Sequence, residues 1–228
     1  MKRIQVLDCT LRDGGYCNDW NFGAKNITRI LHGLKDAGID IVECGYLSES
    51  APSRQGCTRF SRLSQIEGFL PSHGKHQCFV AMINFGEYDA DNLPQRSQGA
   101  IEGIRLAFHK RDVADALEMC PKIQEKGYRL FVQPMVTMAY RDEEFLELIH
   151  CVNRICPEAF YIVDSFGAMK RKDLLRFFYL ADHNLSPEIK LGFHAHNNLQ
   201  LAYSNAQTLA DIQTDRKLII DTSVYGMG

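Results

Sequence analysis

Gly192-Phe193-His194-Ala195-His196-Asn197-Asn198 follows the apolar residues Ile189 and Leu191 and is typical of the end of a β-strand. Side chains alternate between the two faces of a strand, so His194 and His196 should point the same way. At roughly 3.3 Å per residue their imidazoles lie about 7 Å apart along the strand, close enough to converge on one metal ion. The alternative is two unrelated polar residues in a loop.

A second stretch, Leu7–Gly15, offers the oxygen ligand that a histidine pair lacks. It follows a short alternating strand, Ile4–Cys9, and continues as Arg12-Asp13-Gly14-Gly15. In a parallel α/β protein the carboxyl ends of the strands are where ligands bind. Asp13 would complete the metal site, with Arg12 beside it to hold a carboxylate or a developing enolate oxygen. A turn stabilised by an Arg–Asp pair is the alternative.

Strand and helix patterns alternate along the whole chain, and several strands are short runs of Val, Ile and Leu, as in a parallel sheet covered by helices. The expected strands are Ile4–Cys9, Asp40–Cys44, Gln77–Ile83, Ile101–Phe108, Tyr128–Pro134, Phe160–Val163, Lys190–Phe193 and Leu218–Ser223. The expected helices are Lys25–Ala37, Arg59–Leu70, a weak one near Asp89–Gln98, Val113–Lys126, Asp142–Ile155, Lys172–Asp182 and Leu199–Ala210. Eight such units predict a (β/α)₈ TIM barrel.

The eighth expected strand is followed by only a few residues, up to Gly228. A complete barrel typically has about 250 residues. We therefore expect residues 1–228 to be a TIM-barrel catalytic domain that stops after strand eight, without helix eight or anything C-terminal to it.

Composition is ordinary for a soluble globular protein, with 45% hydrophobic and 24% charged residues among 228. The net charge of −2 and the absence of a basic run argue against nucleic acid or an anionic membrane as a partner. No apolar run approaches the ~18 residues of a membrane span, so a cytoplasmic location is expected. The eight cysteines show no CxxC spacing and are interpreted as reduced and mostly structural.

Four ordered motifs resemble the DRE-TIM metallolyase superfamily, the aldolases and lyases similar to hydroxymethylglutaryl-CoA lyase, and most nearly the 4-hydroxy-2-oxovalerate aldolases. They are Thr10-Leu11-Arg12-Asp13-Gly14, Asp164-Ser165-Phe166-Gly167-Ala168-Met169, Gly192–Asn198 and Asp221-Thr222-Ser223-Val224-Tyr225-Gly226-Met227-Gly228. The resemblance implies a metal-dependent lyase that cleaves or forms a 4-hydroxy-2-oxo acid through a pyruvate-type enolate. It implies a small 2-oxo acid as substrate, and a homo-oligomer or a partner dehydrogenase is a further possibility.

The resemblance also assigns roles to residues that follow other strands. Glu43 would orient Arg12, unless it forms a purely structural salt bridge. The Ser165 hydroxyl would bond the substrate carboxylate, unless it caps the following turn. Arg105 lies inside an apolar run and should be paired, either with a substrate acid or with Glu43 or Glu102. Mixed ligation by Asp13, His194 and His196 suits Mn²⁺ or Mg²⁺, with Zn²⁺ also compatible.

The sequence departs from the aldolase pattern at the general base. Those enzymes carry a histidine shortly after Arg-Asp-Gly, whereas this chain continues Gly14-Gly15-Tyr16 and has no histidine before His32. Tyr16 is therefore the candidate proton shuttle, although an ordinary tyrosine pKa of about 10 is high for a base at neutral pH.

Two other functions stay open. One is an acetyl-CoA-dependent Claisen acyltransferase of the isopropylmalate synthase type, although the Glu-Gln that acyl-CoA members carry after Arg-Asp-Gly is absent. The other is a barrel that binds metal without catalytic activity, which the missing histidine favours.

Overall fold

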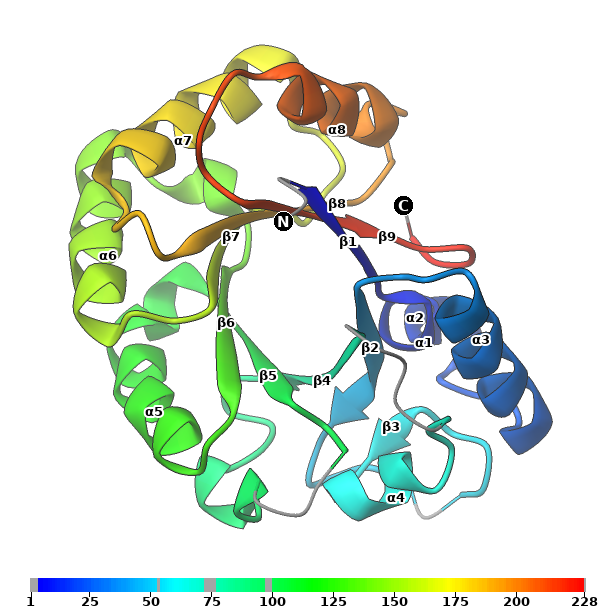
Figure 1. Ribbon diagram of the computed structural model, residues 1–228. Coiled ribbons are helices and arrows are strands. Elements are labelled where there is room, and N and C mark those ends of the chain that lie inside the picture. The colour runs from blue at the N-terminus through cyan, green and yellow to red at the C-terminus, as the bar shows by residue number, and fades with distance from the viewer. Residues whose placement is uncertain (1–3, 53, 72–76, 97–99, 228) are drawn as a thin grey trace.

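The computed structural model describes residues 4–52, 54–71, 77–96 and 100–227, which form a closed barrel of parallel strands with helices outside it (Figure 1). The barrel strands are β1 (Ile4–Asp8), β2 (Ile41–Leu47), β4 (Cys78–Asn84), β5 (Gly103–Phe108), β6 (Arg129–Pro134), β7 (Ala159–Asp164), β8 (Lys190–Ala195) and β9 (Leu218–Thr222). β1 pairs with both β2 and β9, which closes the ring. The eight predicted strands and the (β/α)₈ fold are confirmed.

Most predicted helices are present, with no end shifted by more than three residues. The helices are α1 (Thr10–Asp13), α2 (Gly15–Asn18), α3 (Ala24–Asp36), α4 (Leu63–Glu67), α5 (Val113–Glu125), α6 (Asp142–Ile155), α7 (Arg171–Asn184) and α8 (Ala202–Asp211), with short 3₁₀ turns η1 (Ala90–Asn92), η3 (Lys110–Asp112) and η4 (Thr137–Ala139). The one-turn helices α1 and α2 lie where the sequence indicated only a turn.

Two helix predictions are wrong in part. Residues 59–60 form a short strand, β3 (Arg59–Phe60), because they pair with Tyr46 and Leu47 at the end of β2, so that only α4 remains of the predicted helix. Of the predicted helix Asp89–Gln98, the described residues form the short turn η1 and no α-helix, while Ser97 and Gln98 lie outside the described residues. Pro94 explains the early end, since proline disfavours helical backbone in the residue before it.

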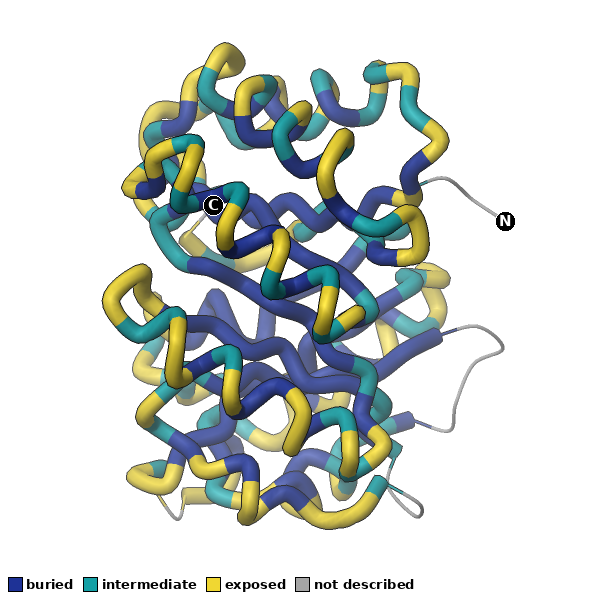
Figure 2. Tube along the Cα trace, turned by 90° about the vertical axis from the view of Figure 1, so that its left-hand side faces the viewer, coloured by how far each residue is buried: buried dark blue, intermediate teal, exposed yellow. Residues whose placement is uncertain are grey.

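The core between barrel and helices forms because each long helix carries one apolar stripe. In α6 the buried residues are Phe145, Leu148, Ile149 and Val152, the i, i+3, i+4, i+7 spacing of a single helix face. Figure 2 shows this arrangement, with buried segments running through the strands and exposed segments recurring along the outer helices. The helices therefore fix the strands and leave the carboxyl ends of the strands to carry function.

Inside the barrel the side chains change character along the axis. The inner apolar cluster near the amino ends of the strands includes Leu7, Ile41, Val80, Phe131 and Ile219. Above it lies a buried charged layer formed by Glu43, Arg105 and Asp221, and above that a small cluster of Tyr46, Met82 and Ala107. Layered filling of this kind is the normal core of a TIM barrel, but charge in the middle layer is not.

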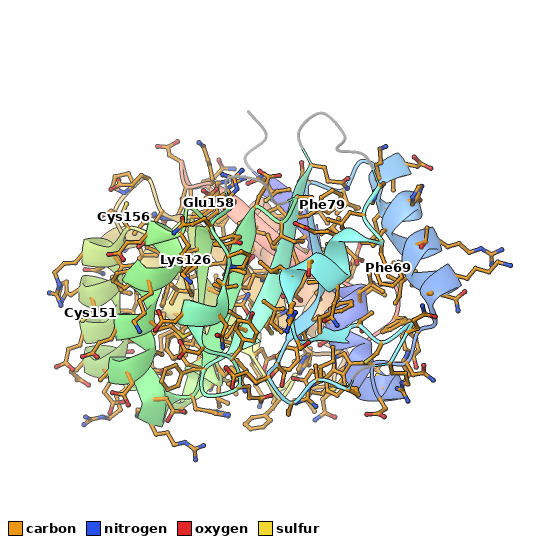
Figure 3. The ribbon with its side chains drawn as sticks, turned by 90° about the horizontal axis from the view of Figure 1, so that it is seen from below. Phe69, Phe79, Lys126, Cys151, Cys156 and Glu158 are labelled. Carbon is orange, nitrogen blue, oxygen red and sulfur yellow. The ribbon has the colours of Figure 1, made fainter. Side chains whose placement is uncertain are left out.

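The amino-terminal end of the barrel carries ion pairs of its own. Glu158, labelled in Figure 3, precedes β7 and pairs with Arg129 at 2.6 Å and with Lys190 at 2.5 Å. These partners start β6 and β8, so the three side chains join neighbouring strands at the end opposite the carboxyl ends of the strands. We assign them to stability.

The outer surfaces of β1 and β9 lie between α8 and α3 and border an open groove (Figure 1). Its apolar lining includes Ile4, Val6, Ala202, Ala206 and Ile220. The expected domain boundary after strand eight stays a prediction. Among the described residues, every helix is too short or too polar to cross a bilayer.

Candidate active site

The predicted metal ligands converge at the carboxyl ends of β1 and β8. Asp13 ends the one-turn helix α1, His194 lies in β8, and His196 follows it directly. Asp13, His194 and His196 each offer one ligand atom, and the three atoms lie within 4.8 Å of one another. The alternation along β8 thus places both imidazoles on the same side, as the sequence predicted.

Hydrogen bonds fix the orientation of both imidazoles. His196 Nδ1 donates to the carbonyl oxygen of Ser165 at 2.7 Å, and His194 Nδ1 donates to the carboxylate of Asp221 at 2.8 Å. A carbonyl can only accept, so His196 carries its proton on Nδ1. In His194, burial lowers the pKa, so the neutral ring also carries its proton on the Nδ1 that faces Asp221. Both Nε2 lone pairs therefore point into the site, the arrangement that neighbouring partners impose on metal-binding histidines.

The donor set fits a divalent cation. His196 Nε2, an acceptor in this tautomer, lies 3.1 Å from Asp13 Oδ1, also an acceptor. Two acceptors this close require a cation or a proton between them. Without a cation, a proton on His196 Nε2 fills this place: burial would lower the pKa of His196, but the hydrogen bond to Asp13 raises it. Burial would raise the pKa of Asp13, but the same hydrogen bond and the Arg12 charge hold it well below its usual range. Once a cation displaces the His196 proton, an ionised carboxylate and two neutral imidazoles match Mn²⁺, Mg²⁺ or Zn²⁺.

Close backbone approach explains the glycines around Asp13. A Cβ at Gly226 would collide with the Asp13 carboxylate, whose Oδ2 accepts the backbone N–H of Met227 at 2.7 Å. A Cβ at Gly14 would lie 2.6 Å from the carbonyl oxygen of Tyr225. The loop after β9 therefore closes against α1 only because both positions lack a side chain.

Arg12 is held over the pocket by two carboxylates. Its Nε donates to Glu43 at 2.8 Å and its Nη1 to Asp13 at 3.0 Å, and the Arg12 side chain is almost fully buried. Its Nη2 lies 3.5 Å from His194 Nε2. The predicted contact between Glu43 and Arg12 is thus present, and it is also part of a larger buried network.

The sequence analysis allowed Arg105 to contact a substrate acid. The structure corrects this expectation, because Arg105 is buried in the barrel interior and bound by carboxylates of the protein. The side chain has no exposed surface, pairs with Glu43 at 2.8 Å and binds Asp221 through its other nitrogen. Its guanidinium also lies over the ring of Tyr161 at 5.0 Å. Of the alternatives considered for Arg105, the pair with Glu43 is the one found.

Asp221 is the residue that sequence reasoning missed. It was recognised within a motif but given no role, whereas it binds both His194 and Arg105. Burial would raise the pKa of Asp221, but the charge of Arg105 and the hydrogen bond from His194 lower it overall. The only available signal was a carboxylate at the end of the eighth predicted strand, directly beside the strand that carries the histidines.

The remaining predicted residues line one cavity of about 130 Å³. Its wall contains Arg12, Tyr16, Tyr46, Met82, Asn84, Ala107, Gln133, Met135, Val163, Ser165, His194, His196 and Met227. Ser165 Oγ accepts the backbone N–H of Val136 at 2.9 Å, so it joins β7 to the loop after β6 instead of capping its own turn. Its own O–H stays available to the cavity.

Tyr16 lies at the cavity edge with about half of its surface exposed, against the indole of Trp20. Partial burial of the hydroxyl raises the pKa of Tyr16 above its ordinary value of 10. The shift makes the phenolate rarer at neutral pH, so Tyr16 is less suited to accept a proton than the sequence alone indicated.

Asp8 makes stability depend on pH. It accepts both the N–H and the O–H of Thr10, yet burial raises the pKa of Asp8 to about 6. The folded protein therefore keeps a proton that the unfolded chain releases, and stability should fall as pH rises from about 4 to about 6. At about 1.4 kcal/mol per pKa unit the loss is on the order of 3 kcal/mol.

Urea unfolding at several pH values, compared between the natural chain and Asp8→Asn, tests this expectation. As pH rises, the natural chain should lose unfolding free energy relative to Asp8→Asn. Parallel pH profiles for the two proteins would contradict it.

Residues 3–228 match the family described as HMGL-like. The chain belongs to the HMGL-like family. Membership confirms the resemblance to the DRE-TIM superfamily that the four motifs indicated, and it covers the whole barrel.

Named relatives of this HMGL-like chain are aldolases. A 4-hydroxy-2-oxovalerate aldolase from Thermomicrobium roseum is 30% identical over 228 residues, which cover 98% of this chain and 62% of the relative. One from Geobacillus genomosp. 3 is 26% identical over 227 residues, covering 99% and 66%. The chain thus spans somewhat less than two thirds of the length of these curated relatives.

A solved structure shows the same fold at lower identity. Hydroxymethylglutaryl-CoA lyase from Pseudomonas aeruginosa superposes with a TM-score of 0.76 at 14% identity, covering 98% of this chain and 77% of the other. At this identity the HMGL-like chain and the lyase share the barrel, and the likeness says nothing further about substrate.

Proposed function

We propose that this chain carries the active site of a divalent-metal-dependent aldolase that cleaves or forms a 4-hydroxy-2-oxo acid through a pyruvate-type enolate. The observation that carries the proposal is the orientation of His194 and His196, whose Nε2 atoms both face Asp13 beside the Arg12 guanidinium. The aldolase relatives support the same reaction class.

Asp13, His194 and His196 would hold the cation, with Asp221 and the Ser165 carbonyl as the partners that orient the imidazoles. When bound, a divalent cation supplies a Lewis acid at this wall of the cavity. Mn²⁺ or Mg²⁺ is proposed, and Zn²⁺ suits the same ligands.

Arg12 supplies fixed positive charge for the enolate. As the C3–C4 bond breaks, its electron pair moves toward C2 and the ketone oxygen becomes negative. The guanidinium is already held by Glu43 at 2.8 Å, so little reorganisation is needed as the charge develops. The Ser165 hydroxyl can donate to the substrate carboxylate while its oxygen accepts from Val136.

The test of the proposed function is direct assay of the metal-supplemented protein. Racemic 4-hydroxy-2-oxopentanoate should yield pyruvate, detected enzymatically, and chelation should abolish the release. Proton NMR in D₂O should show exchange of the pyruvate methyl protons. A metal-loaded protein that neither releases pyruvate nor exchanges its protons would remove the proposal.

Arg12→Lys should lower kcat although the positive charge is retained. Lysine lacks the planar fork that contacts Glu43 and Asp13 together, so the cation loses its fixed position. We expect a loss of about 10²-fold, the size found when one oxyanion-stabilising donor is removed. Steady-state kinetics measure it, with the exposed Arg141→Lys as control. Unchanged turnover in Arg12→Lys would exclude Arg12 from enolate stabilisation.

A metal-binding barrel without catalysis is the second candidate. The raised pKa of Tyr16 favours it, because the residue expected to replace the missing histidine is a poor base. Such a protein would bind Mn²⁺ and pyruvate in calorimetry and yet show no methyl proton exchange.

A further inference from the structure

The aldolase reaction needs a group that removes the proton of the substrate 4-hydroxyl, and no histidine follows Arg12-Asp13-Gly14 before His32. We infer that Tyr46 and Glu87 together accept this proton, with the Tyr46 hydroxyl in the cavity and the Glu87 carboxylate behind it. The inference rests on the proposed function and assigns two residues that the sequence analysis did not consider.

A β-bulge turns Tyr46 into the cavity. Glu43 pairs with Val80 and Tyr46 pairs with Met82, so three steps along β2 match two along β4. Without the extra residue, alternation from the inward-facing Glu43 would send Tyr46 outward toward the helices. With it, Tyr46 joins Met82 and Ala107 in the cluster that lines the cavity and is only 3% exposed.

Gly45 makes the bulge possible. Its φ of 153° is outside the ordinary range of L-residues, and a Cβ there would lie 2.5 Å from the carbonyl oxygen of Thr58. The extra strand β3 packs against the bulge, with Arg59 opposite Tyr46. The backbone around Tyr46 is therefore built to hold this side chain inward.

Glu87 is positioned to take a proton from Tyr46. The Glu87 carboxylate lies close enough to the Tyr46 hydroxyl to raise the pKa of Tyr46. The same carboxylate accepts from Asn84 Nδ2 at 3.0 Å and lies 3.4 Å from the Arg59 guanidinium. Arg59 in turn lies over the Tyr46 ring at 5.8 Å. Asn84 and Arg59 thus fix the carboxylate behind the cavity wall, where Tyr46 is the titratable neighbour that lines the cavity.

Tyr46 acts as a relay that stays protonated between turnovers. Burial and the neighbouring Glu87 carboxylate raise its pKa, so a free phenolate is disfavoured. During cleavage the 4-hydroxyl proton passes to Tyr46 Oη as the tyrosine's own proton passes to Glu87. The C4–O bond becomes a carbonyl, and the C3–C4 electron pair becomes the enolate. The proton on Glu87 returns through Tyr46 to C3, which gives the 2-oxo acid and restores both residues.

Two substrates separate this role from a structural one. Cleavage of 4-hydroxy-2-oxopentanoate requires removal of a hydroxyl proton, whereas decarboxylation of oxaloacetate forms the same enolate and has no such proton to remove. Tyr46→Phe and Glu87→Gln should therefore lose cleavage by about 10²-fold or more, the usual contribution of a general base. Both should retain Mn²⁺ affinity and the release of CO₂ from oxaloacetate, which precedes protonation of C3, and formate should partly restore cleavage in Glu87→Ala.

Matched controls are Tyr179→Phe and Glu147→Gln, both on exposed helical surfaces. Tyr46 is buried, so Tyr46→Phe could lose activity through a folding defect. Glu87→Gln tests the same relay with less risk to folding, because the Glu87 side chain is 39% exposed. Equal loss of cleavage and decarboxylation in both variants, or unchanged cleavage in either, would overturn the inference while leaving the proposed function intact. A natural protein inactive on both substrates would overturn the proposed function and this inference together.

Discussion

Arg105→Met is expected to lower the free energy of unfolding by about 3–5 kcal/mol, the cost of removing one partner from a buried ion pair. The side chain has no exposed surface and neutralises Glu43 and Asp221 in the middle layer of the barrel. Methionine fills similar volume but leaves Glu43 with Arg12 alone and Asp221 with no cation, only the hydrogen bond from His194. Urea unfolding followed by circular dichroism measures the change.

A second set of variants separates charge from packing. Arg105→Met combined with Glu43→Gln and Asp221→Asn should recover part of the lost stability, because the buried negative charges are removed with the positive one. Arg141→Met, in an exposed pair with Glu144, should change stability by less than about 0.5 kcal/mol. A loss below about 1 kcal/mol in Arg105→Met, typical of exposed pairs, would contradict the network.

His196→Ala should weaken Mn²⁺ binding by more than about 100-fold, since even the loss of an outer hydrogen-bond partner of a metal ligand costs about 10–100-fold. One of three converging donors is removed, and Asp13 loses the neighbour 3.1 Å from its Oδ1. Isothermal titration with Mn²⁺ measures the affinity. Protons compete for the same Nε2, so affinity in the natural protein should fall as pH drops.

Asp221→Asn provides a graded comparison, with an expected loss of about 10–100-fold because it disturbs only the hydrogen bond that orients His194. The exposed His183→Ala on α7 is the matched control and should bind Mn²⁺ like the natural protein. Equal affinity in His196→Ala and His183→Ala would show that the metal binds elsewhere.

The barrel was predictable because its signals are local. Apolar runs of strand length alternated with helical stripes, and the i, i+2 spacing of His194 and His196 put both on one face whatever the rest of the chain does. Asp13 and Arg12 followed a strand, and parallel strands bring their carboxyl ends to one end of the barrel. Local pattern plus parallel topology was thus sufficient for the ligand triad.

The partners of Arg105 were not predictable in the same way. Arg105 and Asp221 are 116 residues apart, and which of several acids meets a buried guanidinium depends on the stagger between β5 and β9 across the barrel interior. The sequence showed that Arg105 needs a partner, because an unpaired buried charge is too costly. It could not choose between substrate and protein carboxylates.

The direction of Tyr46 was decided by tertiary structure against the local pattern. Strict alternation from Glu43 places residue 46 on the outer face, but the bulge at Gly45 adds one residue to β2 and returns Tyr46 to the cavity. The bulge exists because β3 packs beside it, and β3 lies in a stretch whose sequence favoured a helix. The sequence by itself determined the barrel and the convergence of Asp13, His194 and His196 through side-chain periodicity, whereas pairing between distant strands decided the charged layer and the residues that line the cavity.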